Sequence, residues 1–191
     1  MYGPLMRAVC VAAVVSLVGL PVAQAQNNPS AVVGVTLNAT KKETLSLSGV
    51  TASASLVAAT GIADSSTAND FTPISVTTDW NLKTSTNVTL VGYFANPAQA
   101  LVANGTDFIT SSQVEGKLST QPAASFAAFT GAPVGSAGVA GATLSFWSQA
   151  VAGPTLKSNR TEVLNLRLNM TNAFAVAGDY TGTLNLRAIA Q

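Results

Sequence analysis

The side chains that could carry chemistry in this sequence are almost all carboxylates. The chain of 191 residues contains no histidine and a single cysteine, Cys10. Triads that pair a serine or cysteine with histidine are therefore excluded, and so are histidine-ligated metal sites. Two carboxyl groups can hydrolyse a glycosidic bond when they lie roughly 5–10 Å apart. The acidic residues available for such a pair are Glu43, Asp64, Asp70, Asp79, Asp107, Glu115, Glu162 and Asp179.

These acidic residues are scattered over expected turns and strand edges, where a carboxylate usually forms a turn or is solvated. We therefore predict that the protein is not an enzyme, and a hydrolase that uses two carboxylates is the third hypothesis. Asp64, Asn69 and Asp70 offer oxygen ligands of the kind that calcium prefers. Their spacing matches no compact calcium loop, so no metal ion or other cofactor is predicted.

Two arginines, Arg167 and Arg187, occupy equivalent positions in a repeated strand pattern, because the sequence Leu-Asn-Leu-Arg ends at each of them. Leucines that alternate with polar residues predict strands with the leucines on one face and the arginines on the other. Turn residues at 178–182 predict that the two strands form an antiparallel pair, with both arginines on one sheet face. Like charges directly opposite each other would repel, so the arginines would bracket a carboxylate or a ligand only if the register separates them, with Glu162 as a local partner. The alternative is that both are solvated and cover the sheet with their aliphatic stems.

Aromatic residues supply a second kind of binding site, because a planar row of exposed rings stacks on sugars. Leu144 and Phe146 share one face of an expected strand at 143–149, which places Trp147 on the opposite, exposed face. Trp80 lies on the apolar face of another strand and is expected in the core. The candidate rings for a carbohydrate-binding module are Trp147, Tyr93 and Phe129.

Residues 1–25 have the three parts of a signal peptide. Arg7 precedes the apolar run Ala8–Leu20, and Ala23-Gln24-Ala25 forms a small-x-small cleavage site. The apolar run is shorter than the ~20 residues that a membrane-spanning helix needs. Cleavage is thus predicted to leave no integral membrane segment, and the protein is expected to be secreted, periplasmic or bound at the cell surface.

Removal of this leader would leave a neutral chain without cysteine. The leader contains Cys10 and Arg7, one of the nine basic residues, so the basic residues that remain equal the eight acidic ones. No nucleic-acid partner is expected, because the basic residues are few and scattered. Only 9% of the residues are charged, and a polar but uncharged surface can form close contacts without desolvating charges. Self-association or binding to another exported protein is the predicted partnership, with a glycan as the alternative.

Short alternating and apolar runs predict about eight to ten strands and no long helix after the leader. Two of the runs, at 74–82 and 88–94, flank turn residues and are predicted to form a hairpin. An Ala/Gly/Pro-rich connection occupies about 119–142, and Phe126 and Phe129 either pin it to the core or are exposed. The remaining strands are expected at 31–37, 45–50, 114–118 and 143–149 and in the two copies of the repeated pattern. Residues 26–191 are therefore predicted to form a single antiparallel β-sandwich domain.

The stretch Ala177–Leu184, which reads A-G-x-Y-x-G-x-L, resembles the closing strand of many bacterial immunoglobulin-like domains. In that pattern the tyrosine packs its ring and returns its hydroxyl to the backbone. Residues 70–191 as a whole resemble uncharacterised exported bacterial proteins. The resemblance implies an immunoglobulin-like sandwich and carries over no catalytic or binding residue.

Pilus subunits assembled by a chaperone and an usher are also exported immunoglobulin-like domains. This chain departs from them, because it lacks their cysteine pair and has Ala190 where they often carry a penultimate tyrosine. Strand exchange by another route is still open, since the apolar segment Ala31–Leu37 could add to the sheet edge of a neighbour. The leading prediction is an exported, non-enzymatic structural or interaction module, and the alternative is a carbohydrate-binding module.

Overall fold

The computed structural model describes residues 39–58, 60–67 and 69–191. The chain divides after Thr40 into two units, and every described strand belongs to the unit that begins at Lys41. The predicted signal peptide and the predicted first strand, at 31–37, lie outside the described residues.

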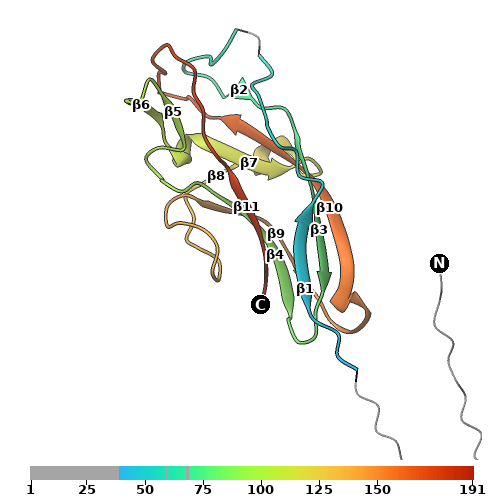
Figure 1. Ribbon diagram of the computed structural model, residues 1–191. Coiled ribbons are helices and arrows are strands. Elements are labelled where there is room, and N and C mark those ends of the chain that lie inside the picture. The colour runs from blue at the N-terminus through green and yellow to red at the C-terminus, as the bar shows by residue number, and fades with distance from the viewer. Residues whose placement is uncertain (1–38, 59, 68) are drawn as a thin grey trace, which may run out of the picture. The chain divides into compact units, whose positions relative to one another are not determined.

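The described part of the chain is all-β and its strands pair antiparallel, as the sequence predicts (Figure 1). Its only helical turns are short 3-10 segments, and no described helix is long and apolar enough to cross a membrane. These segments are η1 (Ser111–Gln113), η2 (Ala123–Ser125) and η3 (Gly153–Leu156).

One layer is a six-stranded sheet in the order β1-β3-β10-β7-β8, with β2 paired to the end of β10. Its central strand, β10, is twelve residues long and pairs with β3 on one side and β7 on the other. The bounds are β1 Thr44–Ser48, β2 Asn69–Asp70, β3 Ile74–Asn81, β7 Val114–Leu118, β8 Ala127–Ala128 and β10 Lys157–Leu168.

The second layer is a three-stranded sheet in the order β11-β4-β9, and a separate hairpin joins β5 to β6. The described residues thus contain eleven strands instead of the expected eight to ten. The difference comes from pairings as short as two residues, such as β2 and β8, which no alternating pattern can predict. The bounds are β4 Asn87–Tyr93, β5 Leu101–Ala103, β6 Asp107–Ile109, β9 Thr143–Ala150 and β11 Asn185–Ala190.

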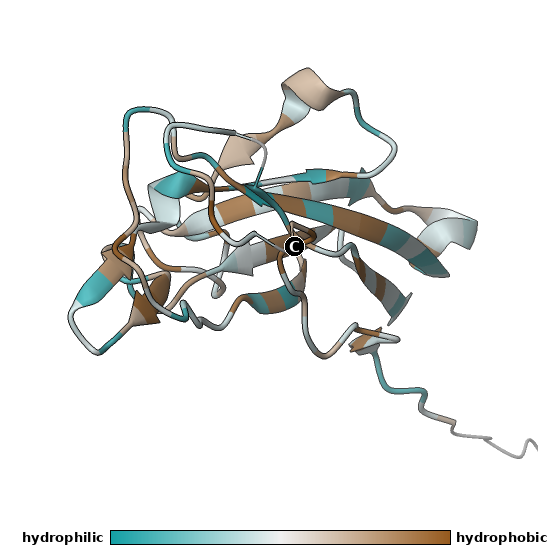
Figure 2. Ribbon diagram, turned by 90° about the horizontal axis from the view of Figure 1, so that it is seen from above, coloured by the Kyte–Doolittle hydropathy of each residue, from teal (hydrophilic) through white to brown (hydrophobic). Residues whose placement is uncertain are grey.

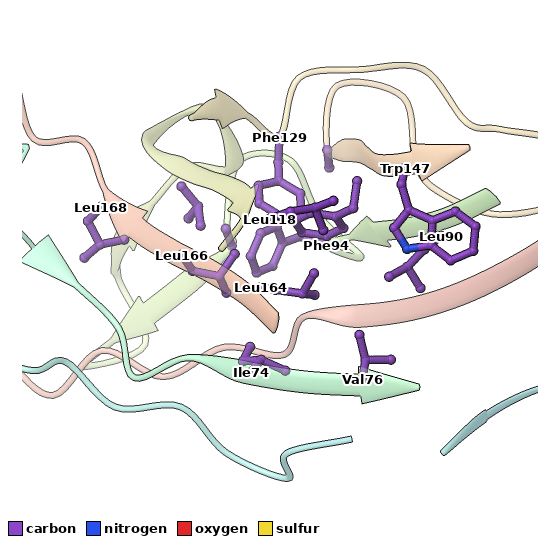
Figure 3. Packing of buried hydrophobic residues seen from close by; sticks show 14 of the residues in the cluster. Ile74, Val76, Leu90, Phe94, Leu118, Phe129, Trp147, Leu164, Leu166 and Leu168 are labelled. Atoms are coloured by element: carbon purple, nitrogen blue, oxygen red, sulfur yellow. The ribbon is translucent and has the colours of Figure 1, made fainter. Parts of the chain in front are cut away.

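The two layers share one core, which contains buried apolar residues of β3, β4, β7, β9 and β10 (Figures 2 and 3). In β10 the repeated leucines Leu164, Leu166 and Leu168 are all buried, as predicted. In β3 burial alternates along the whole strand. Trp80 of β3 is buried, as predicted, and its ring meets Trp147 of β9 across the layers at a centroid distance of 6.4 Å.

The two copies of the repeated pattern do not pair with each other. The first copy lies in β10 of the six-stranded sheet, whereas the second lies in β11 of the three-stranded sheet, next to β4. The predicted pair was therefore wrong, and Arg167 and Arg187 do not share a sheet face. Alternation specifies which side of a strand is buried, and both strands meet that requirement from opposite layers.

The predicted hairpin of residues 74–82 and 88–94 was wrong for the same reason. These residues form β3 and β4, which belong to different sheets. The connection between them crosses from one layer to the other, and it ends where Thr86 and Asn87 donate their amides to the carbonyl of Gln191. Turn residues therefore marked the end of each strand correctly without identifying its partner.

A β-bulge in β9 overturns the predicted exposure of Trp147. Leu90 of β4 pairs with Trp147, but the next residue, Val91, pairs with Ser145, so Phe146 has no partner across the ladder. An extra residue in one strand resets the alternation of its side chains. Phe146 and Trp147 are consecutive and yet both buried, at 6% and 7% exposure.

Two glycines make room for the bulged Phe146. A Cβ atom on Gly92 of β4 would lie 2.7 Å from the Phe146 ring, and one on Gly116 of β7 would lie 2.9 Å from it. Phe129 completes the packing, since its ring meets Phe146 edge-on at 6.0 Å. Strands from both layers thus leave the space that this one ring fills.

The Ala/Gly/Pro-rich connection at 119–142 covers the outer faces of both sheets. Its first half runs over the six-stranded sheet and contributes β8. Its second half covers the three-stranded sheet, where Ala137 and Val134 pack on Val91 and Ile189. Between the two halves Phe129 is completely buried, which confirms the prediction that it pins the connection to the core.

Candidate functional site

A cleft of about 840 Å³ lies between the two layers in the described part of the chain. Its floor consists of buried core side chains of both sheets. Its walls are the loop that follows β1 and the segment that precedes β11, which lie at the same end of the folded unit in Figure 1. The floor residues are Ile74, Phe94, Val114, Leu166 and Leu168.

The cleft exists because the two layers differ in strand length. β10 has twelve residues, whereas β11 begins only at Asn185 and has six. The inner face at the end of β10 is therefore not covered by a facing strand. Residues 178–184 approach it without regular pairing, except that Thr181 and Val102 exchange backbone hydrogen bonds.

Exposed apolar side chains lie on this cleft or on segments next to it. Every large hydrophobic residue that is exposed in the described part of the chain lies on a segment beside it. Val50 lines the cleft, Val57 follows the lining residue Leu56, and Phe108 pairs with Val102 next to Thr181. We call this set the apolar rim, and it consists of Val50, Val57, Phe108, Phe174 and Val176.

Phe174 and Val176 are held in the apolar rim by contacts of their neighbours. Ser65 donates its amide to the carbonyl of Ala173, and Ala175 donates its amide to the carboxylate of Asp64. The alternating residues Phe174 and Val176 are 77% and 60% exposed. An ordered backbone thus presents two large apolar side chains to solvent.

The cleft is nearly free of charge. Asp179 is the only charged residue that lines it, and that residue is exposed. The phenol of Tyr180, another lining residue, donates to the carbonyl of Val176 at 3.1 Å, so its hydroxyl is already bound. Such a surface suits an apolar, uncharged occupant better than a charged small molecule.

The three aromatic candidates for sugar stacking do not converge on this cleft. Phe129 is completely buried, and Trp147 is nearly so, which contradicts the predicted exposure of Trp147. The guanidinium of Arg160 covers the Trp147 ring at 4.6 Å, on the inner side of the sheet. Tyr93 is half-buried at the end of β4. No planar row of exposed rings forms among these three.

Arg167 is part of a closed polar cluster on the outer face of the six-stranded sheet. Its Nε and one terminal nitrogen each lie 2.7 Å from the Glu115 carboxylate, whose other oxygen accepts from Asn169 at 2.7 Å. The Phe126 ring lies 4.1 Å from the guanidinium carbon of Arg167 and 5.3 Å from the ammonium of Lys117. Residues of the cluster thus bind both carboxylate oxygens of Glu115.

Arg187 lies on the outer face of the other sheet and donates to the carbonyl of Ser136 at 2.9 Å. The predicted local partner of the arginines, Glu162, instead pairs with Arg160 at 2.6 Å. The two arginines therefore do not bracket a common ligand. Each holds part of the 119–142 connection against its own sheet.

The calcium-ligand candidates also hold loops together. Asn69 is buried, and its side-chain amide bonds to the backbone of Ala63 and Ser66, while Asp64 accepts from Ala175. Within residues 39–58, 60–67 and 69–191, no group of three or more acidic residues, cysteines or histidines is placed to hold a metal ion.

No protein-family model, curated protein or solved structure matches this chain. The geometry of the cleft and the apolar rim is therefore the basis for a function. Sequence reasoning missed both features, because their residues lie in loops without alternation. The available signal was the occurrence of Val57, Phe174 and Val176 within segments of small and polar residues.

Proposed function

We propose that this protein is an exported, non-enzymatic interaction module that self-associates through the cleft and the apolar rim. The observation that carries the proposal is the apolar rim itself. A soluble monomer rarely gathers its exposed large hydrophobic side chains in one region, and where it does so the region usually binds a protein or a ligand. Here Val50 lines the open cleft, and the other four such side chains of the described residues lie on segments that adjoin or contact the segments lining it.

The proposal includes an immunoglobulin-like sandwich of the kind found in exported bacterial proteins. Two antiparallel sheets with one shared core support it. The bond from the Tyr180 hydroxyl to the Val176 carbonyl is the backbone contact that the resemblance implies. Export to the periplasm, the cell surface or the medium rests on the signal-peptide pattern of residues 1–25.

A binding role is favoured over catalysis and over sugar recognition by the contacts of the candidate residues. Asp64 and Glu115 accept hydrogen bonds that fix a loop and a strand, and the sequence contains no histidine. Trp147 and Phe129 lie inside the core and offer no stacking surface. Self-association through apolar contacts needs neither kind of group.

The test is the mass of residues 26–191 in solution, measured by light scattering over a concentration series. We expect oligomers whose fraction grows with concentration. Replacing both Phe174 and Val176 by serine should weaken association at least about tenfold, because two exposed apolar side chains are lost from the interface. The control replaces Lys41 and Lys157, which are exposed outside the apolar rim, by serine and should associate like the unaltered protein. A monomer at every concentration would contradict the proposal.

A further inference from the structure

We infer that the cleft receives the segment Ala31–Leu37 of a second copy of this chain as an added β-strand. The inference rests on the proposed self-association and names the surface and the segment that produce it. It combines three observations: the shape of the groove, the free edges of two strands and the composition of the segment.

The cleft continues into a groove that suits an extended chain. A second hollow of about 330 Å³ lies between residues 45–47 of β1 and residues 186–188 of β11. Leu47 and Leu186 line both hollows, so the two form one groove along the edges of the layers. A compact ligand would fill only the wide part of such a groove, whereas an extended peptide can fill its whole length.

The two strands that border the groove have free edges. Among the described residues β1 pairs only with β3, and β11 pairs only with β4. The backbone amides and carbonyls on the other edge of each strand have no ladder partner among the described residues. An added strand would satisfy these groups with its main chain and place alternate side chains in the apolar cleft.

The segment Ala31–Leu37 has the composition that this groove requires. It reads Ala-Val-Val-Gly-Val-Thr-Leu, without charge or proline, and three of its residues are β-branched valines, which favour strands. In an extended chain Ala31, Val33, Val35 and Leu37 share one face and can enter the cleft. Seven residues extend over about 23 Å, at ~3.3 Å for each residue.

The place where β1 begins favours a second copy over the same chain. Residues 39–43 precede β1 and are exposed. If the segment of the same chain folded back on β1, it would lie first against the five residues of that strand. The wider part of the cleft begins beyond them, at Val50 to Leu56. The segment of a second copy has no such restriction and can enter the wide part directly.

The test separates the donating segment from the receiving groove, with residues 26–191 as the protein. The donor variant carries Val33→Asp and Val35→Asp, and the acceptor variant carries Leu47→Arg. Each variant alone should associate at least about tenfold more weakly than the unaltered chain, because each places a charge against the nearly uncharged lining of the cleft. Mixed in equal amounts, they should form 1:1 dimers, since one keeps an intact groove and the other an intact segment.

Matched controls introduce the same new residue types, aspartate and arginine, at positions outside the proposed interface. Asn27→Asp with Asn28→Asp adds two charges before the segment, and Leu156→Arg changes a half-buried leucine that lines neither hollow. Both controls should associate like the unaltered protein. If the donor variant still associates as the unaltered chain does, the inference is wrong while the proposed self-association stands. If the unaltered chain is monomeric throughout, the proposed function itself has failed.

A second measurement does not depend on how well the acceptor variant folds. Residues 26–191 contain no cysteine, so single cysteines can be introduced without background. A mixture of Val35→Cys and Leu47→Cys should yield a disulfide-linked dimer of the two variants under mild oxidation. Val35→Cys mixed with Lys157→Cys, on the exposed start of β10, should not. Equal cross-linking in both mixtures would overturn the inference.

Discussion

Arg167 and Arg187 lie on the outer faces of opposite sheets, and each contacts one half of the same connection, 119–142. Arg167 packs on Phe126 of the first half, and Arg187 donates to the carbonyl of Ser136 in the second half. The repeated Leu-Asn-Leu-Arg pattern therefore does the same structural task in both layers. Its leucines face the core, and its arginine holds an irregular segment over the outer surface.

The two arginines should nevertheless contribute unequally to stability. Arg167 is mostly buried in an ion pair with Glu115, whose side chain is only 12% exposed. Arg167→Ala leaves that carboxylate without its charged partner and should lower the free energy of unfolding by about 1–3 kcal/mol. Arg187→Ala removes one bond to an exposed backbone carbonyl and should cost clearly less. Urea denaturation of both variants measures the difference, and equal losses would contradict the closed cluster around Glu115.

Trp147 should act as a core residue and not as a sugar-binding residue. Its ring contacts Trp80 across the layers and lies under Arg160. Trp147→Ala should lower the free energy of unfolding by about 3–5 kcal/mol, the usual cost of truncating a buried aromatic side chain. Thermal unfolding followed by circular dichroism measures this loss. Trp147→Phe is the matched control and should lose much less, because it keeps most of the buried apolar surface.

The close packing around the Phe146 ring leads to a separate prediction about stability. Gly116→Ala places a methyl group 2.9 Å from the Phe146 ring and 3.0 Å from Leu166. Forcing this extra group into the filled core should destabilise the protein by about 1–3 kcal/mol. The control Ser145→Ala changes an exposed residue beside the bulge and should stay within about 0.5 kcal/mol of the unaltered protein. An unchanged stability of Gly116→Ala would show that Phe146 does not fill the gap between the two glycines.

The sequence was sufficient to predict which face of β3 and of β10 is buried. Alternation in β3 and β10 identified Trp80 and the three leucines correctly, because burial on one face imposes a period of two. It could not identify the partner strands, since a strand of either layer meets the same condition. The alternation also predicted the wrong face for Trp147. The extra residue at Phe146 shifts the alternation in β9, and no residue type in this part of the sequence indicates the shift.

The candidate site was harder to predict than the core. A cleft depends on where one strand ends relative to another, and here β10 extends past the start of β11. That relationship joins residues far apart in the sequence and has no local pattern. The segment proposed to fill the groove, in contrast, is visible in the sequence as an uncharged apolar run, Ala31–Leu37.

Two consecutive threonines of β3 should respond to the same substitution with opposite signs. Thr78 is 1% exposed and has the only buried side-chain polar atom that lacks a hydrogen-bond partner within the described residues. Thr78→Val replaces that hydroxyl by a methyl group of similar size. It should raise the free energy of unfolding by about 1 kcal/mol, because an unsatisfied buried polar group is removed.

Thr77 supplies the matched comparison, because its hydroxyl bonds to that of Thr161 on β10 at 2.8 Å. Thr77→Val removes this bond between neighbouring strands and should lower the free energy of unfolding by about 0.5–1 kcal/mol. Both variants keep a β-branched side chain, so the strand propensity of the position is unchanged. Urea denaturation of the pair isolates the hydrogen bond from the side-chain shape. A loss of stability in Thr78→Val as large as that in Thr77→Val would show that the Thr78 hydroxyl is satisfied in solution.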